Sequence, residues 1–304
     1  MVVTHGSFAN FRGRTALTIG NFDGVHRGHQ ALIERVVAKG RELQLTSCVL
    51  TFEPHPREFF ARDAAPARLT RLYDKLELIA ASGIERVHLI RFNARFAAMA
   101  AARFIDEVLV GTLGVGWLLV GRDFRFGAGR TGDFSTLQDA AGEHGFTLEA
   151  MPDVALDGER VSSSAVRAAL AAGDFARAER LLGRPYAISG KVIPGARLGR
   201  ELGFPTANVA LGQRPPLSGI YVVAVDGLGR GVASVGKRPT VNPVPTPLLE
   251  VHLFDWDGEL YGQRLRVRFL RKLRDEAKFD DLAALRRAIA QDAEQARQYF
   301  ARHG

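Results

Sequence analysis

The sequence is poor in cysteine and has no long apolar run. Cys48 is its single cysteine, so the chain cannot form an internal disulfide, and a reducing cytoplasm is the expected compartment. No stretch stays apolar over the roughly 20 residues that a membrane-spanning helix needs. The first residues also lack the pattern of a signal peptide. We therefore expect a cytoplasmic protein without a membrane partner.

Acidic residues are outnumbered by basic ones, with 33 Asp and Glu against 41 Lys and Arg and a formal charge of +8. Such an excess admits nucleic acid as a partner. The basic residues, however, are scattered among acids and form neither a stripe nor a patch interleaved with aromatic residues. We predict a solvated, arginine-rich surface and no nucleic-acid partner, while small phosphorylated substrates would profit from the same charge.

Glycines punctuate the segment that follows the first predicted strand, Ala16 to Ile19. They are Gly20, Gly24 and Gly28. Without a Cβ, the backbone can bend sharply and approach a bulky anion, and the N-terminus of a helix predicted to open near His29 would favour phosphate. His26 lies three residues before His29, so both imidazoles can face one ligand. The pattern indicates a nucleotide phosphate site. The alternatives are a structural turn and a metal site, for which two histidines without a third ligand make a poor zinc set.

The first part of the chain alternates predicted strands and helices. The strands are 16–19, 47–52, 87–92, 117–121 and a short one at 146–151, and the helices lie at 69–81, near 104–110 and at 134–144. Alternation implies a mostly parallel sheet covered on both faces. Ligands gather beyond the carboxyl ends of such strands. We therefore predict that the loops 20–29, 53–56 and 121–133 share one rim.

A run of serines opens the next predicted helix. Ser162, Ser163 and Ser164 offer an N-cap and hydroxyls, and Arg167 lies one turn further, on the same side of the helix. A structural cap is the simpler interpretation. Together with the earlier glycine turn, the run looks like a second phosphate clamp. A helix at 174–183 closes this part of the chain.

The pattern changes at Arg184 and Pro185. Strands without intervening helices follow at 186–193, 220–225, 232–236, 248–254 and 264–270, and only the stretch from about 280 to 302 is strongly helical. Six or so antiparallel strands at this spacing predict a small closed barrel with a terminal helix. We therefore expect two domains, 1–183 and 184–304.

A second candidate site lies between the first barrel strand and Val209. Gly195 and Gly199 permit a tight loop, to which Arg197 and Arg200 give positive charge. The loop ends in Thr206 and Asn208, whose hydroxyl and amide could hold a hard cation or a phosphate oxygen; a β-turn with a satisfied asparagine is the alternative. Glu250 shares a strand face with His252, and an exposed strand glutamate without catalytic role is the alternative there.

With these motifs in view, the chain resembles the prokaryotic bifunctional riboflavin kinase/FMN adenylyltransferases, also called FAD synthetases, over nearly its whole length. The matching segments of the first half are GNFDGVHRGHQ (20–30), FEPHP (52–56), VGRDFRFG (120–127) and SSSAVR (162–167). Those of the second half are GRELGFPTANV (199–209), SGIYVV (218–223) and LEVHLFDWDGELYGQ (249–263).

The resemblance implies a Rossmann-like nucleotidyltransferase domain followed by a riboflavin kinase β-barrel of six strands with a terminal helix. Such an enzyme phosphorylates riboflavin to FMN with ATP and then adenylylates FMN to FAD, releasing pyrophosphate. Mg²⁺ is the implied cofactor, and the partners are small molecules, with no oligomeric state implied. Two rival functions are a stand-alone nucleotidyltransferase with a regulatory barrel and a non-catalytic protein that binds nucleic acid or flavin.

The resemblance also assigns roles to residues. The catalytic set is Glu250, as the base of the kinase, with His26 and His29 on the ATP phosphates. Further nucleotide contacts fall to Gly20, Asn21, Phe22, Gly28, Ser162, Ser163, Ser164, Arg167, Gly195 and Gly199. The third serine stands where threonine is more usual. The flavin is assigned to His55, Asp123 and Phe124, although some relatives carry asparagine in place of the aspartate, and magnesium to Thr206 and Asn208.

Overall fold

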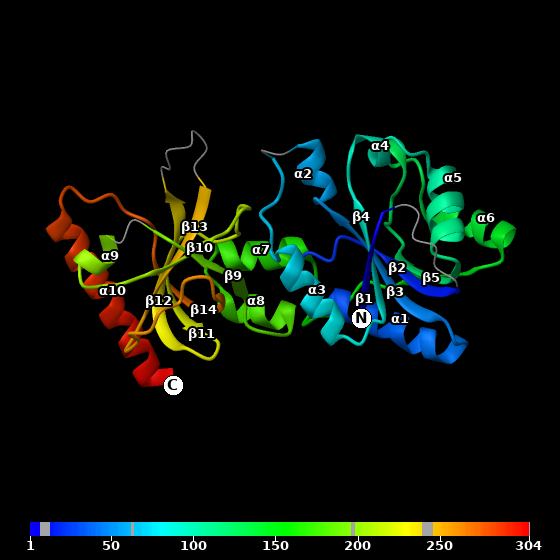
Figure 1. Cartoon of the computed structure of the whole chain (residues 1–304). Coiled ribbons are helices and arrows are strands. Elements are labelled where there is room, and N and C mark those ends of the chain that lie inside the picture. The colour runs from blue at the N-terminus through cyan, green and yellow to red at the C-terminus, as the bar shows by residue number, and fades with distance from the viewer. Residues whose placement is uncertain (7–12, 62–63, 196–197, 239–245, 304) are drawn as a thin grey trace. The chain divides into compact units, whose positions relative to one another are not determined.

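The computed structural model describes residues 1–6, 13–61, 64–195, 198–238 and 246–303. They form two compact units (Figure 1). Unit 1 consists of Met1–Pro66 and Leu72–Ser162, and unit 2 of Ala67–Arg71 and Ser163–Gly304. Each unit has its own sheet, so the fold follows from two separate cores.

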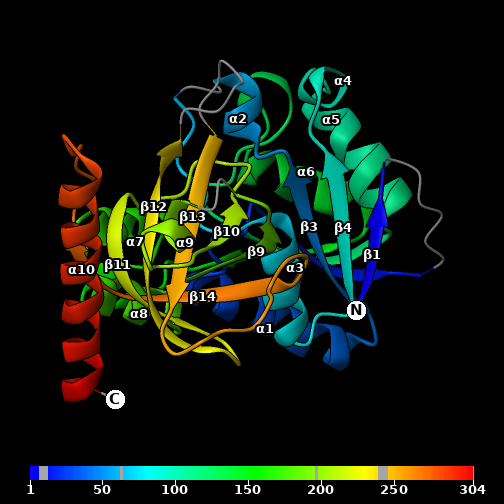
Figure 2. The same ribbon diagram turned by 60° about the vertical axis from the view of Figure 1, so that its left-hand side comes forward.

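Unit 1 is built on a six-stranded parallel sheet. The strands are β1 (Val2–His5), β2 (Thr15–Ile19), β3 (Thr46–Glu53), β4 (Arg86–Arg91), β5 (Val115–Gly121) and β6 (Thr147–Met151). Their order is β1-β4-β3-β2-β5-β6, and every neighbouring pair is parallel. Figure 2 shows β1, β4 and β3 side by side. The prediction of a parallel α/β first half is thus confirmed.

Helices cover both faces of this sheet. They are α1 (Arg27–Leu43), α2 (Pro56–Phe60), α3 (Leu72–Ala81), α4 (Ala94–Ala97), α5 (Ala101–Arg103), the π-helix η1 (Phe104–Thr112), the 3₁₀ turn η2 (Ala128–Arg130) and α6 (Phe134–His144), with a hairpin of β7 (Ala155–Leu156) and β8 (Glu159–Arg160). Strand β2 is buried throughout. Its Leu17 packs under η1 and α6, whereas Ala16 packs under α1 and α3. Apolar runs such as ALTI are typical of strands buried on both sides.

Two local predictions for unit 1 need correction. Helix α3 begins at Leu72, not at Leu69. Leu69 fits the helical spacing because it is buried (2% exposed), but it is buried outside the helix. Helix α1 begins at Arg27, not at His29, because the His26 side chain caps it by accepting a hydrogen bond from the His29 backbone. Strand β1 was not predicted at all.

Unit 2 contains a closed six-stranded barrel. Its strands are β9 (Ala187–Ile193), β10 (Ala207–Ala210), β11 (Gly219–Val225), β12 (Gly229–Arg238), β13 (Thr246–Leu253) and β14 (Arg264–Arg274). They close in the order β10-β13-β12-β11-β14-β9, with each pair antiparallel. The barrel prediction is confirmed, although β10 lies in a stretch whose sequence predicts a loop.

Helices complete unit 2. They are α7 (Ser163–Ala171), α8 (Phe175–Leu182), the short α9 (Leu198–Glu201) and the terminal α10 (Leu282–His303). Helix α10 runs along the barrel (Figure 2) and buries Ala296 and Phe300 against outward-facing Val222 and Val232. Helix α8 contacts the barrel through Phe175, whose ring meets Tyr221 edge-on at 5.9 Å. Helices α7 and α8 therefore belong to the same compact unit as the barrel. The predicted boundary between the two catalytic domains, at 183/184, stays a prediction.

His88 gives unit 1 an expected sensitivity to acid. It is fully buried on β4, where its Nδ1 lies 2.9 Å from the hydroxyl of Thr4 on β1. Burial, with smaller effects of Arg86 and His5, lowers its pKa. Because the folded ring resists protonation, stability is full above the ordinary pKa of about 6.5 and falls by about 1 kcal/mol per pH unit below it, until the lowered pKa is reached. Urea unfolding of His88→Gln at pH 7.5 and 5.5 should show a shallower fall than the wild type.

The matched control is His303→Gln, since this histidine is exposed near the end of α10. It should keep the pH dependence of the wild type. An identical slope for His88→Gln and the wild type would contradict the assignment.

Candidate active sites

The predicted rim of unit 1 lies at the carboxyl ends of β2, β3 and β5. These strands are parallel neighbours that end at Ile19, Glu53 and Gly121. The loops that follow them therefore leave the same edge of the sheet, as predicted. The connection order also reverses here, since the chain proceeds from β2 to β3 and β4 on one side and to β5 and β6 on the other. Ligands of open α/β sheets bind at such a point.

The turn after β2 has an unusual backbone. Phe22, Gly24 and Val25 all have left-handed φ angles, of 50°, 87° and 40°, which is strained for a β-branched side chain. The Phe22 ring, 1% exposed, fills the core beneath the turn, and a Cβ on Gly20 would lie 3.1 Å from it. The Phe22 ring thus anchors the turn in the core and is not itself available to a ligand. A strained turn that the core holds in place is a feature of functional sites.

The two predicted histidines meet at the start of α1. Their rings stack with centroids 3.6 Å apart and planes at 18°. His26 Nδ1 accepts a hydrogen bond of 3.3 Å from the backbone N–H of His29. A neutral His26 ring therefore carries its proton on Nε2, which makes that nitrogen a donor. A Cβ on Gly28 would lie 3.2 Å from His26 Nδ1, so the glycine leaves room for the imidazole.

Two further polar groups lie near this turn. The side-chain oxygen of Asn21 is buried and has no hydrogen-bond partner among the described residues. The carbonyl oxygen of Val161 would lie 3.5 Å from a Cβ on Gly28, which brings the residue before the serine run beside the turn. Ser163 and Ser164 open α7 in unit 2, where Arg167 Nε donates to the carbonyl of Ala67 at 2.6 Å.

The three residues assigned to the flavin lie in the other two rim loops. His55 caps α2: its Nδ1 accepts from the Arg57 backbone at 3.1 Å, and it is 8% exposed. The exposed carboxylate of Asp123 pairs with Arg160 at 3.1 Å. Phe124 stacks on Phe126, with centroids 5.6 Å apart.

Sequence reasoning missed a row of aromatic rings beside His55. Edge-on and tilted contacts of 5.2–6.0 Å join Phe52, Phe59, Phe60, Phe92 and Phe96. Phe60 is 69% exposed and Phe59 39%. Exposed phenylalanines gathered in this way mark binding surfaces. The signal was available, since Phe59 and Phe60 follow the FEPHP motif (52–56) after two intervening residues.

The barrel brings its predicted residues together through strand register. Asn208 on β10 is the direct partner of Glu250 on β13, and such partners have Cβ atoms about 5 Å apart. Thr206 directly precedes β10, and a Cβ on Gly199 would lie 3.3 Å from its hydroxyl. A Cβ on Gly195 would collide with the Asn208 amide. Arg197 lies outside the described residues.

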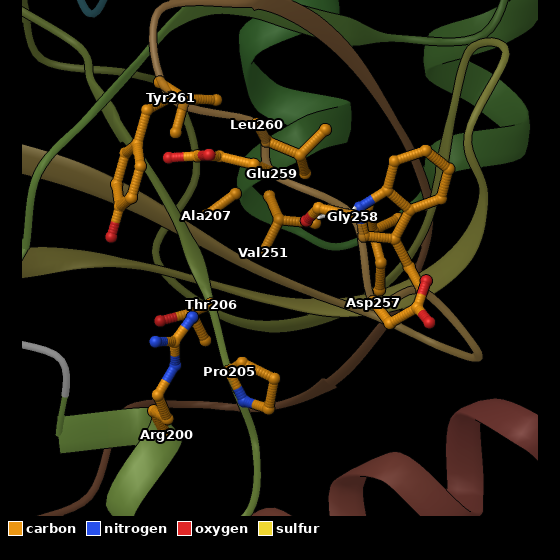
Figure 3. Close-up of a pocket in the computed structure, with 13 residues that line it drawn as sticks. Arg200, Pro205, Thr206, Ala207, Val251, Asp257, Gly258, Glu259, Leu260 and Tyr261 are labelled. Atoms are coloured by element: carbon orange, nitrogen blue, oxygen red, sulfur yellow. Dashed lines mark hydrogen bonds between the residues drawn. The ribbon is translucent and has the colours of Figure 1, made fainter.

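A cavity of about 410 Å³ opens beside these residues (Figure 3). Thr206 and Ala207 line it, together with Arg200, whose guanidinium points toward Thr206. The other wall includes Trp256, Asp257, Gly258, Glu259, Leu260 and Tyr261. Asn208 and Glu250 do not line this cavity. Strand alternation places them on the opposite face of β10 and β13 from Ala207 and Val251.

The Asn208 side chain is suited to a cation. It is 7% exposed, its Nδ2 donates to the Thr206 carbonyl at 3.4 Å, and its Oδ1 has no hydrogen-bond partner among the described residues. A buried carbonyl oxygen without a donor is costly unless a ligand satisfies it. Within the described part of the chain, no three His, Cys, Asp or Glu side chains form a metal cluster.

A glycine-rich turn with two histidines above a parallel sheet, and a barrel that sets a carboxylate opposite an amide, are the arrangement expected of a nucleotide-dependent transferase with two modules. Family models agree: that of FAD synthetase matches residues 9–165, and that of riboflavin kinase matches residues 182–300. The chain therefore belongs to the family of bifunctional riboflavin kinase/FMN adenylyltransferases.

Relatives of this family match the chain over nearly its whole length. The bifunctional riboflavin kinase/FMN adenylyltransferase of Pseudomonas fluorescens is 52% identical over 297 residues, which cover 96% of this chain and 95% of that protein. The enzyme of the same name from Escherichia coli K12 is 50% identical and covers 93% and 92%. A crystal structure from Streptococcus pneumoniae, described as a macrolide-efflux protein, aligns with a TM-score of 0.79 at 27% identity over 98% of this chain and 99% of that one.

These findings confirm the predicted family, fold and function. The chain is a bifunctional transferase that makes FMN from riboflavin and FAD from FMN, with ATP as co-substrate. The efflux name belongs to the pneumococcal protein; in the described part of this chain, no helix is long and apolar enough to cross a membrane.

Proposed function

We propose that the barrel phosphorylates riboflavin in a site formed by Thr206, Asn208 and Glu250. We also propose that unit 1 adenylylates FMN in a site at the turn that carries His26 and His29. The observation that carries this division is the pairing of Asn208 with Glu250 across two strands. It sets a proton acceptor beside a cation ligand in one unit, whereas the turn of the other unit combines imidazoles with a helix N-terminus.

Glu250 acts as the base of the kinase. The nucleophile is a primary alcohol of riboflavin, which attacks poorly while it holds its proton. The Glu250 carboxylate takes that proton as the oxygen bonds to the γ-phosphorus of ATP and ADP leaves. General-base assistance of this kind is worth ~10²- to 10⁴-fold.

Thr206 and Asn208 hold Mg²⁺ in the same site. A hydroxyl and an amide oxygen, completed by phosphate oxygens and waters, form a set that Mg²⁺ accepts, and the unsatisfied Asn208 oxygen fits this role. When bound, the ion neutralises charge on the transferred phosphate. The glycines at 195 and 199 keep the loop close to both ligands.

Unit 1 needs no base, because the phosphate of FMN is already an anion at neutral pH. It attacks the α-phosphorus of ATP, and pyrophosphate leaves. Alignment of the reactants and positive potential on the triphosphate suffice. His26 Nε2, His29 and the backbone N–H groups of Gly28 and its neighbours supply both, and we assign Asn21 to the same phosphates. Ser162, Ser163, Ser164 and Arg167 are proposed as a further phosphate clamp because they match the family's SSSAVR motif.

The aromatic row provides the flavin surface of unit 1. The planar, apolar isoalloxazine ring suits the exposed rings of Phe59 and Phe60, and Phe124 and His55 extend this surface along the rim. Asp123, paired with Arg160, borders it with a polar group.

A single incubation tests the proposed function. Riboflavin, ATP and Mg²⁺ are mixed with the protein and sampled over time by chromatography, and FMN should appear first and FAD later. Product from FMN but not from riboflavin would favour a stand-alone nucleotidyltransferase. Salt-sensitive binding of RNA or DNA without any turnover would favour a binding protein.

Removing the Asn208 oxygen should weaken the use of magnesium in one reaction only. For Asn208→Leu, we expect the Mg²⁺ concentration at half-maximal kinase rate to rise ~10-fold or more, because a ligand to a charged group is lost. FMN adenylylation by the same protein is the control and should keep its Mg²⁺ dependence. An unchanged Mg²⁺ titration of the kinase would remove Asn208 from the metal site.

We also propose a cytoplasmic location and no nucleic-acid partner. Cys48 is a free thiol, fully buried, and burial raises its pKa to about 12, so it is poorly reactive. Basic surface residues such as Arg35 and Arg268 are paired with acids, which supports a solvated surface. An electrophoretic shift assay with RNA and DNA at low salt should show no complex.

A further inference from the structure

A short segment of the first half of the sequence belongs to the barrel unit. Residues Ala67–Arg71 form part of unit 2, although the chain on both sides belongs to unit 1. We call these residues the inserted segment. It has no helix or strand, yet Arg68, Leu69 and Thr70 are only 5%, 2% and 6% exposed. Such burial of irregular backbone requires specific partners for its polar groups.

Arg71 joins two strands of the barrel. Its Nη1 donates to the carbonyl of Ser189 on β9 at 2.9 Å and to the carbonyl of Ala210 on β10 at 3.3 Å. The rest of the segment is also fixed, because the Arg68 N–H donates to Arg214 at 3.0 Å and the Ala67 carbonyl accepts from Arg167.

The guanidinium bridges these strands where their own pairing ends. Strand β10 has four residues and pairs with β9 only at Asn208 with Ile193 and at Val209 with Val192. Gly190 leaves the space that Arg71 occupies: a Cβ there would lie 2.6 Å from Arg71 Nη1 and would collide with the Val209 side chain. Arg71 therefore takes the place of ladder hydrogen bonds at the end of the strand that carries Asn208.

We propose that Arg71 is a positioning residue of the riboflavin kinase. It holds β10 in place between β9 and β13, so that Thr206 and Asn208 stand at the correct distance from Glu250. This inference rests on the site assigned above. Arg71 lies within residues 9–165, which match the FAD synthetase model. The inference therefore makes this arginine a requirement of the riboflavin kinase activity.

The test compares three full-length variants. In Arg71→Met, the two carbonyls lose their donor, and we expect kinase kcat/KM for magnesium-ATP to fall ~10- to 100-fold, because small displacements of reacting groups have effects of this size. KM for magnesium-ATP should rise and FMN adenylylation should not change. Arg71→Lys should recover most of the loss, because one ammonium group can donate to both carbonyls. Arg287→Met, an exposed arginine of α10, is the matched control and should behave like the wild type.

Each other outcome overturns the proposal. A purely structural arginine would lower the amount of folded protein and reduce kinase kcat without changing KM for magnesium-ATP. Unchanged kinase kinetics in Arg71→Met, or an equal fall of both activities, would also exclude a positioning role. Failure of the proposed function is distinguished separately, since the wild type would then form no FMN from riboflavin.

Discussion

Glu250→Gln is expected to stop riboflavin phosphorylation and to leave FMN adenylylation intact. The amide keeps the size of the side chain and its place opposite Asn208, but it cannot accept the proton of the attacking alcohol. The kinase rate should therefore fall by the full value of the base, ~10²- to 10⁴-fold. Because the effect removes a proton acceptor and not a binding contact, kcat should fall while KM for riboflavin changes little.

The measurement is the initial rate of FMN formation from riboflavin and, in a separate assay, of FAD formation from FMN. Glu259→Gln is an informative comparison, because this carboxylate lines the nearby cavity but does not face Asn208. It should retain the base and most of kcat. Loss of both activities in folded Glu250→Gln protein would refute the assignment of two separate sites.

His29→Ala is expected to have the opposite effect, with adenylylation lost and riboflavin phosphorylation preserved. The imidazole stacks on His26 at 3.6 Å and contacts Phe22 at 5.0 Å, so its removal takes away the proposed phosphate donor and the packing that orients the other ring. Removing one donor to developing charge typically lowers kcat ~10²- to 10³-fold. The same two rate assays measure the outcome.

His303→Ala serves as the control for this prediction, because His303 lies at the end of α10 and belongs to neither site. It should leave both rates unchanged. If His29→Ala slowed the kinase as much as the adenylyltransferase, while the protein remained folded, His29 would have to serve both reactions.

Sequence reasoning found the elements whose secondary structure is visible in a short stretch of residues. The continuous apolar run at 16–19 and the apolar/polar alternation around Glu250 each predict a strand from a few residues alone. The histidine pair was visible from its spacing, and α1 brings the two rings into contact as that spacing implied. The family motifs then assigned roles that no local pattern could supply.

The elements that were missed depend on distant parts of the chain. Strand β1 has only four residues, half-exposed, and exists because it pairs with β4 more than 80 residues later. Strand β10 is equally short and is defined by its partners β13 and β9. Leu69 matched a helical pattern because it is buried, but it belongs to unit 2, whereas helix α3 belongs to unit 1. The periodicity of apolar residues predicts which side chains are buried, but it does not predict the element against which they pack.

The inserted segment also bears on how this polypeptide can be dissected. A cut at the predicted boundary would release a C-terminal fragment, 184–304, without Ala67–Arg71 and without α7 and α8, all of which belong to the barrel unit. The kinase fragment would therefore lack segments that pack against its barrel and that come earlier in the chain. Point substitutions can silence one reaction at a time, whereas expressing the halves as separate genes would leave the second one incomplete.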